Sequence, residues 1–164
     1  RMLEAGEDPL FLARRIVRMA VEDIGLADPQ ALVVANAAKE AYDFLGSPEG
    51  ELALAQAVIY VATAPKSNAA YVAYKAARRL AQDKGSLTPP KTILNAPTAL
   101  MREAGYGADY EYDHDAPDGF SGQNYWPEAL NRQKFYHPVA RGFEREIAKR
   151  LEYWQRLRRE RGEN

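Results

Sequence analysis

Two consecutive apolar segments in the first half of the chain decide the fold. Residues 29–46 read PQALVVANAAKEAYDFLG, and residues 48–65 read PEGELALAQAVIYVATAP. Each segment begins at a proline that follows a helix-capping residue, because the first turn of a helix does not need the N–H that proline lacks. Gly46 ends the first segment and Pro65 ends the second. Both segments are apolar around most of their circumference, which predicts two central, buried helices stacked as a hairpin.

Similar start and stop signals predict further helices on either side of this hairpin. Asp8-Pro9 starts a helix over residues 9–24 that stops at Gly25. Further helices are expected over residues 67–84, 98–104 and 139–161. The expected fold class is therefore all-α.

Between the last two helices, residues 105–138 have a different character. They contain eight of the 17 aromatic residues, interspersed with glycine and proline and without a clear period. Such a composition predicts an ordered, irregular loop that aromatic packing holds in place, and it leaves open short strands within the loop.

Composition excludes several classes of protein. The 164 residues are 46% hydrophobic and 27% charged, which is typical of one globular domain and not of a disordered chain. A net charge of −1 gives no overall field that would attract nucleic acid or an anionic membrane. The absence of cysteine excludes disulfides and thiolate sites. The longest apolar run, residues 52–65, is too short to span a bilayer. We therefore expect a soluble, intracellular protein.

Few residues carry recognisable chemistry. The chain contains no GxxxxGK[ST] phosphate loop, so it cannot hold ATP in that way. Asp113-His114-Asp115, with His137, could bind a metal ion, but such residues more often cap turns within a loop. Ser67 is expected to cap the helix that follows it, since no catalytic partner is near it in sequence.

Basic residues gather on the fourth expected helix, although the total charge is near zero. Residues 65–104 hold seven basic and two acidic side chains. The candidate DNA-binding residues are Lys66, Lys75, Arg78, Arg79 and Lys84, with Tyr71 and Tyr74 as stacking candidates. The alternative is an ordinary solvated helix face.

Several motifs, taken in order, resemble one known family. They include GEDPL at residues 6–10, EDIGLADP at 22–29, LAQAVIYVATAPKSN at 54–68, NAPT at 95–98 and GYG at 105–107. The resemblance is to the C-terminal region of the replication-associated recombination protein A family (RarA/MgsA, related to the Werner helicase-interacting protein), and it spans nearly the whole chain. One departure is Asp118-Gly119, where the family pattern has a Gly-Gly pair.

The resemblance implies that the chain is part of an AAA+ ATPase akin to clamp loaders. Such a parent is stimulated by DNA and acts at stalled replication forks in recombination and repair. Its ATP and magnesium sites would precede Arg1, and the lack of an initiator methionine leads us to expect an excised piece of a longer protein. The expected location is the cytoplasm, in association with the nucleoid.

The same resemblance implies a non-catalytic role for the chain itself. It predicts a helical oligomerisation core over residues 1–104, similar to clamp-loader C-terminal domains. Residues 105–164 would be an aromatic-rich loop plus a C-terminal helix, packed into the same domain. The implied assembly is a homotetramer, with DNA and replication proteins as partners of the parent, and no catalytic, cofactor or metal residue is carried over. A DNA- or partner-binding module using residues 67–84, and a metal-dependent enzyme using Asp113, His114 and Asp115, remain alternatives.

The missing phosphate loop generates a first prediction: the purified chain will hydrolyse no ATP. Without backbone amides and a lysine to hold the phosphates, nothing stabilises the charge of the transition state. A phosphate-release assay with magnesium, with and without DNA, checks this expectation. DNA-stimulated hydrolysis by the purified chain would contradict it.

Overall fold

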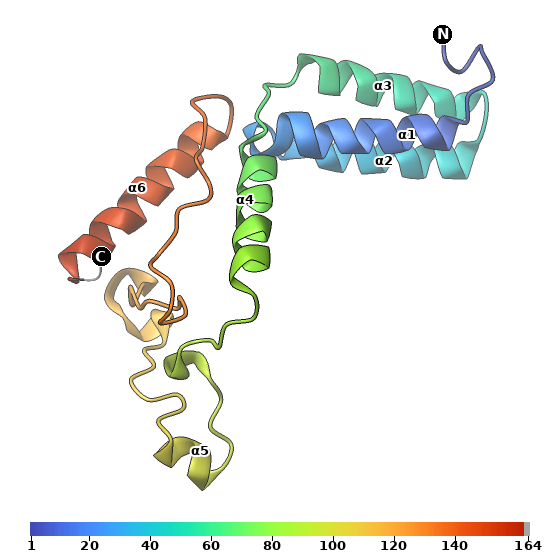
Figure 1. The fold of residues 1–164 in the computed structure, drawn as a ribbon. Helices are drawn as coiled ribbons and strands as arrows, with labels where there is room; N and C mark the ends of the chain where they lie inside the picture. Colours follow the sequence, from blue (N-terminus) through green and yellow to red (C-terminus); the bar gives the residue numbers. More distant parts are fainter. Residues whose placement is uncertain (163–164) are drawn as a thin grey trace. The chain divides into compact units, whose positions relative to one another are not determined.

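The fold is known from a computed structural model that describes residues 1–162, and every regular element among them is helical. Its six α-helices (Figure 1) are α1 (Pro9–Met19), α2 (Gln30–Leu45), α3 (Glu49–Thr63), α4 (Ala69–Lys84), α5 (Ala99–Glu103) and α6 (Glu144–Glu160). No strand occurs in the described part of the chain, including residues 105–138. The all-α prediction is confirmed. No helix within residues 1–162 is both long enough and apolar enough to cross a membrane.

The chain forms two compact units. One comprises Arg1–Ala77 and Phe135–Lys149, and the other comprises Arg78–Lys134 and the described residues from Arg150 onward. These units divide the chain elsewhere than after residue 104, and the division expected from the sequence stays a prediction.

In the first unit, α1, α2 and α3 lie side by side (Figure 1) around an alanine-rich core. The buried residues of this core are Ala13, Ile16, Ala20, Ile24, Ala31, Ala35, Ala38, Leu54, Ala57 and Val61. Alanine side chains let helix backbones approach closely, so few large side chains are needed to fill the space between them. The residues that α2 and α3 bury in this core are therefore mainly small ones.

The prediction that α2 and α3 are central and buried holds only for one side of each helix. Phe44 at the end of α2 is 88% exposed, and Leu52 and Ile59 of α3 are 75% and 66% exposed. On each helix, the side that faces the core carries mainly small residues, and the opposite side carries larger apolar side chains that point outward. The hairpin itself is as predicted, but it leaves an apolar surface uncovered.

The helix over residues 9–24 changes geometry before its end. The α-helical part stops at Met19, and Ala20–Ile24 form a π-helical turn closed by Gly25. The carbonyl oxygen of Asp23, in this wider turn, accepts the N–H of Ser67 at 2.8 Å. A Cβ on Gly25 would lie 2.8 Å from the Ser67 carbonyl oxygen. The wider turn thus lies in close contact with the segment between α3 and α4.

The last helix begins at Glu144, five residues later than the sequence predicts. Gly142 has a φ of +50°, which interrupts any helix, and Phe143 donates its N–H to the Ala27 carbonyl oxygen at 2.8 Å. A Cβ at position 142 would lie 2.0 Å from that same oxygen. A contact distant in sequence therefore sets the start of α6.

This close approach predicts a large effect for Gly142→Ala. We expect it to lower the free energy of unfolding by at least about 2 kcal/mol more than Gly6→Ala, as measured by urea unfolding followed by circular dichroism. Gly6 is a matched control, because its φ of +83° is also left-handed but nothing lies within 4 Å of an added Cβ. Equal losses for the two variants would show that the contact with Ala27 does not matter.

Candidate functional site

A buried carboxylate joins distant segments of the first unit. Glu144 is 0% exposed, and its two oxygens accept the Ser67 hydroxyl at 2.9 Å and the Val139 N–H at 2.6 Å. The Ser67 hydroxyl also accepts the Ala69 N–H at 3.2 Å, so Ser67 caps α4. Burial, together with the nearby Glu144 carboxylate, raises the pKa of Tyr136 above its ordinary value. These contacts organise the backbone and leave no group poised for nucleophilic chemistry.

Lys66 belongs to this framework as well. Its ammonium donates hydrogen bonds to the carbonyl oxygens of Val61 and Ala64, the latter at 2.8 Å. These carbonyls lie at the end of α3, where backbone acceptors have no partner within the helix. Lys66 thus caps α3 beside a hollow of about 510 Å³ that it lines together with Asp23 and Arg141.

The other candidate DNA-binding residues lie on α4. Lys75, Arg78, Arg79 and Lys84 are all exposed on this one helix. Lys75 stands 5.3 Å from the centre of the Tyr71 ring, and Arg79 pairs with Asp83 at 3.7 Å. All four lie on the same helix, with Lys75 in the first unit and Arg78, Arg79 and Lys84 in the second, whereas the ammonium of Lys66 is used in capping α3.

Asp113, His114 and Asp115 form a 3-10 turn in the second unit. Hydrogen bonds from the Ser121 hydroxyl at 2.6 Å and the Ser121 N–H at 2.9 Å hold the pKa of Asp113 below its ordinary value. The His114 ring packs against Tyr112, with 5.0 Å between ring centres. Nowhere in residues 1–162 do three or more His, Asp or Glu side chains gather as a metal site. The geometry supports the turn-forming role of these residues.

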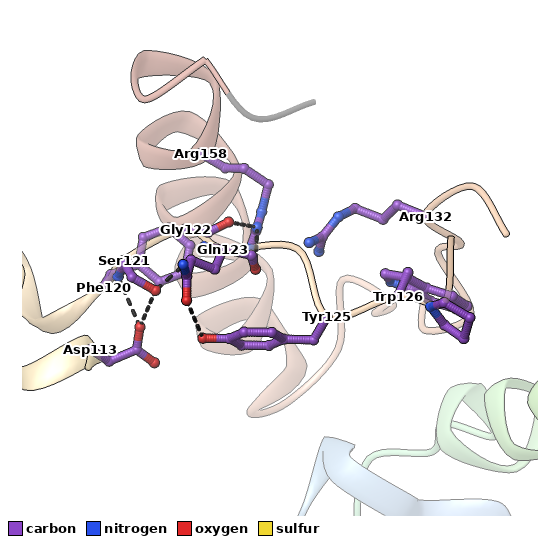
Figure 2. A pocket seen from close by; sticks show the side chains of 10 residues that line it. Asp113, Phe120, Ser121, Gly122, Gln123, Tyr125, Trp126, Arg132 and Arg158 are labelled. Atoms are coloured by element: carbon purple, nitrogen blue, oxygen red, sulfur yellow. Dashed lines mark hydrogen bonds between the residues drawn. The ribbon is translucent and has the colours of Figure 1, made fainter. Parts of the chain in front are cut away.

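A pocket of about 280 Å³ lies in the aromatic-rich part of the second unit (Figure 2). We call it the aromatic pocket, and its lining residues are Asp113, Phe120, Ser121, Gly122, Gln123, Tyr125, Trp126, Pro127, Arg132 and Arg158. The guanidinium of Arg158 lies 5.0 Å from the Phe120 ring centre and donates to the Gly122 carbonyl oxygen. Phe120 in turn packs against Trp154 of α6, with 5.0 Å between ring centres. The pocket thus has a well-connected wall formed by α6 and the loop.

The apolar surface of the α2–α3 hairpin is the second candidate binding surface. We call it the hairpin face and define it by Val33 and Phe44 of α2 and Leu52 and Ile59 of α3, all exposed. A hollow of about 250 Å³ lies between the two helices, lined by Val34, Ala37, Ala38, Ala41, Ala53, Gln56 and Ala57. Large apolar side chains that are exposed on two neighbouring helices are a feature of surfaces that contact other proteins.

Comparison with known proteins agrees with the motifs and the all-helical fold. The sequence model of the family described as "MgsA AAA+ ATPase C terminal" matches residues 1–155. The chain belongs to this family. It is 52% identical over 96% of its length to the Replication-associated recombination protein A of Coxiella burnetii. Proteins of the same name from Haemophilus influenzae and Escherichia coli K12 are 47% and 45% identical over 93% and 92% of the chain.

The chain spans about a third of the length of these relatives, 36% of the Coxiella protein and 34% of the other two. The family resemblance read from the motifs is therefore confirmed, and the chain corresponds to the C-terminal part of this AAA+ ATPase family.

Sequence reasoning missed two features of this family member. Glu144 lies within a stretch that reads as ordinary amphipathic helix, and nothing in the sequence indicates its burial. Arg132 and Tyr125 were visible only as part of an aromatic-rich loop, because pocket formation depends on how that loop folds back on α6. The density of aromatic residues was the available signal.

The buried carboxylate predicts that Glu144→Ala lowers the free energy of unfolding by about 2–4 kcal/mol, because it leaves buried donors unpaired and opens a cavity. Glu146→Ala is the matched control on the same turn, since Glu146 is exposed and pairs with Lys149 at 2.7 Å. The control should change the free energy by no more than about 0.5 kcal/mol. Chemical denaturation of both variants tests the difference, and an equally small loss would mean that Glu144 is dispensable.

Proposed function

We propose that this chain is the non-catalytic oligomerisation domain of a DNA-dependent AAA+ ATPase that acts in replication-fork maintenance, recombination and repair. The hairpin face is the observation that supports self-association. Phe44, Leu52 and Ile59 would each leave water on binding, with a gain of roughly 25 cal/mol per Å² of apolar area before the costs of association. The relatives' printed name supports the role in replication-associated recombination.

The remaining parts of the proposal concern the whole protein. ATP and magnesium would bind in a clamp-loader-like region that precedes this chain. Four copies would assemble, and the whole protein would bind DNA. Replication proteins are the proposed further partners. A protein that acts on chromosomal DNA would be located in the cytoplasm, in association with the nucleoid.

A homotetramer is the proposed assembly. Closed symmetry is the usual outcome of self-association, and a tetramer can be built from two kinds of two-fold contact. The hairpin face supplies one such contact. The number four comes from the family resemblance, and the exposed apolar residues account only for the tendency to associate.

We propose direct DNA contact through α4 as a second function. The exposed Arg78 and Lys84 support it, because neither makes an ion pair within the described residues. Phosphate contacts of this kind are independent of base sequence and weaken as salt is added.

Light scattering of the purified chain near 10 µM tests self-association, since a contact of ~1 µM would be mostly formed there. We expect a mass four times that of the 18.4-kDa chain, and Leu52→Ser should lower it. Leu100→Ser is the matched control, because Leu100 is equally exposed, at 76%, but lies on α5. A monomer at every concentration would refute the proposal, and a dimer would replace the number four by two.

A further inference from the structure

The aromatic pocket has the charge of a site for an anion. Its lining contains two arginines, Arg132 and Arg158, and one carboxylate, that of Asp113. The Asp113 carboxylate already accepts both the N–H and the hydroxyl of Ser121. Arg132 donates a single long hydrogen bond, 3.3 Å to the Asn124 side chain, and no carboxylate of residues 1–162 pairs with it. The guanidinium therefore has donors to offer, and Figure 2 shows it reaching into the pocket.

The pocket also offers an aromatic surface beside this charge. Tyr125 is 38% exposed, and its hydroxyl donates to the Gln123 side chain at 3.4 Å, which orients the ring. Gln123 is held in turn by the Glu111 N–H at 3.0 Å. Trp126 lines the same space. An exposed aromatic ring held in a fixed orientation can stack on a flat ligand at little cost in conformational entropy.

We propose that the aromatic pocket binds one nucleotide of a single-stranded nucleic acid, with the base stacked on Tyr125 and the phosphate bound by Arg132. A pocket of about 280 Å³ is just below the usual range for small-ligand sites, so it has room for one unpaired base and not for a base pair. Arginine suits the phosphate because its planar donors match two phosphate oxygens.

The charged residues around the aromatic pocket favour a nucleic-acid strand, rather than a free nucleotide, as its ligand. Arg159, on the last turn of α6, is exposed and belongs to the same compact unit. Arg161, two residues further on, lies with its guanidinium 5.5 Å from the Phe120 ring centre and pairs with Asp118 at 3.7 Å. Arg159 therefore extends the positive charge beyond Arg132 and Arg158, as a neighbouring phosphate of one strand requires. The inference is independent of self-association and of DNA contact through α4.

The test is the anisotropy of a labelled oligothymidylate of about 15 nucleotides, titrated with the full chain at several salt concentrations. Arg132→Gln should weaken binding at least about fivefold and reduce the magnitude of the log–log salt slope by about 0.7, since one phosphate contact is lost. Tyr125→Leu should weaken binding by a similar factor and leave the salt slope unchanged, because stacking releases no counterions.

Arg102→Gln and Tyr110→Leu are the matched controls. Both residues are exposed in the second unit and lie outside the pocket, so binding should stay within twofold of the wild type, roughly the scatter of such energies. Circular dichroism and light scattering of every variant check that fold and assembly are retained. A double variant, Arg78→Gln with Lys84→Gln, measures the separate contribution of α4.

Three results would overturn the inference. Pocket variants that bind the oligonucleotide as tightly as the controls would exclude the site. So would an Arg78→Gln/Lys84→Gln double variant that binds duplex at least as well as single strand. Competition by thymidine monophosphate at the same concentration of nucleotide would identify a free nucleotide as the occupant. If polyglutamate displaces the strand and Tyr125→Leu does not weaken binding, the occupant of the pocket would instead be an acidic peptide.

Discussion

Alanine lines the seam between α2 and α3, and it permits an approach so close that a larger side chain has no room. Ala35, Ala38 and Ala57 are buried there, and a Cβ on Gly50 would lie 2.8 Å from the Cα of Tyr42. Close packing of small residues excludes water over a long helix contact without large side chains. The large apolar residues of both helices consequently face away from the seam. The same constraint therefore holds the hairpin together and produces the hairpin face through which we propose that copies associate.

The seam alone does not fix how the rest of the first unit packs on the hairpin. That depends on three contacts between segments far apart in sequence: Asp23 with Ser67, Ala27 with Phe143, and Ser67 with Glu144. Each satisfies a backbone or side-chain group that would otherwise be buried without a partner. Together they tie the two turns that follow α1, the start of α4 and the start of α6 to one another. Ser67 belongs to the longest of the motifs that resemble the family, residues 54–68, and this stretch therefore has a structural role.

The second unit relies on a different kind of packing. Instead of an aliphatic core, the Phe120 ring packs against the guanidinium groups of Arg158 and Arg161 and against the ring of Trp154. Polar contacts within the loop add to this, as when Arg161 donates to the Pro117 carbonyl oxygen at 2.6 Å. Asp118 adopts a φ of +63°, a conformation that aspartate tolerates better than most residues. A loop organised in this way can hold an open pocket, which a close-packed aliphatic core would fill.

The sequence by itself determined the all-helical class, the positions of α2 to α5 to within two residues, and the family. These features depend on local rules, because proline, glycine and capping side chains act within one helical turn of where they stand. It did not determine which face of the hairpin is buried, since both helices are apolar on nearly every side. Nor did it determine the π-helical turn at Ala20–Ile24, the start of α6 at Glu144, or the gathering of Arg132 and Tyr125 around one pocket. Only the tertiary structure decided these, because each depends on a contact with a residue that is distant in sequence and that no local pattern identifies.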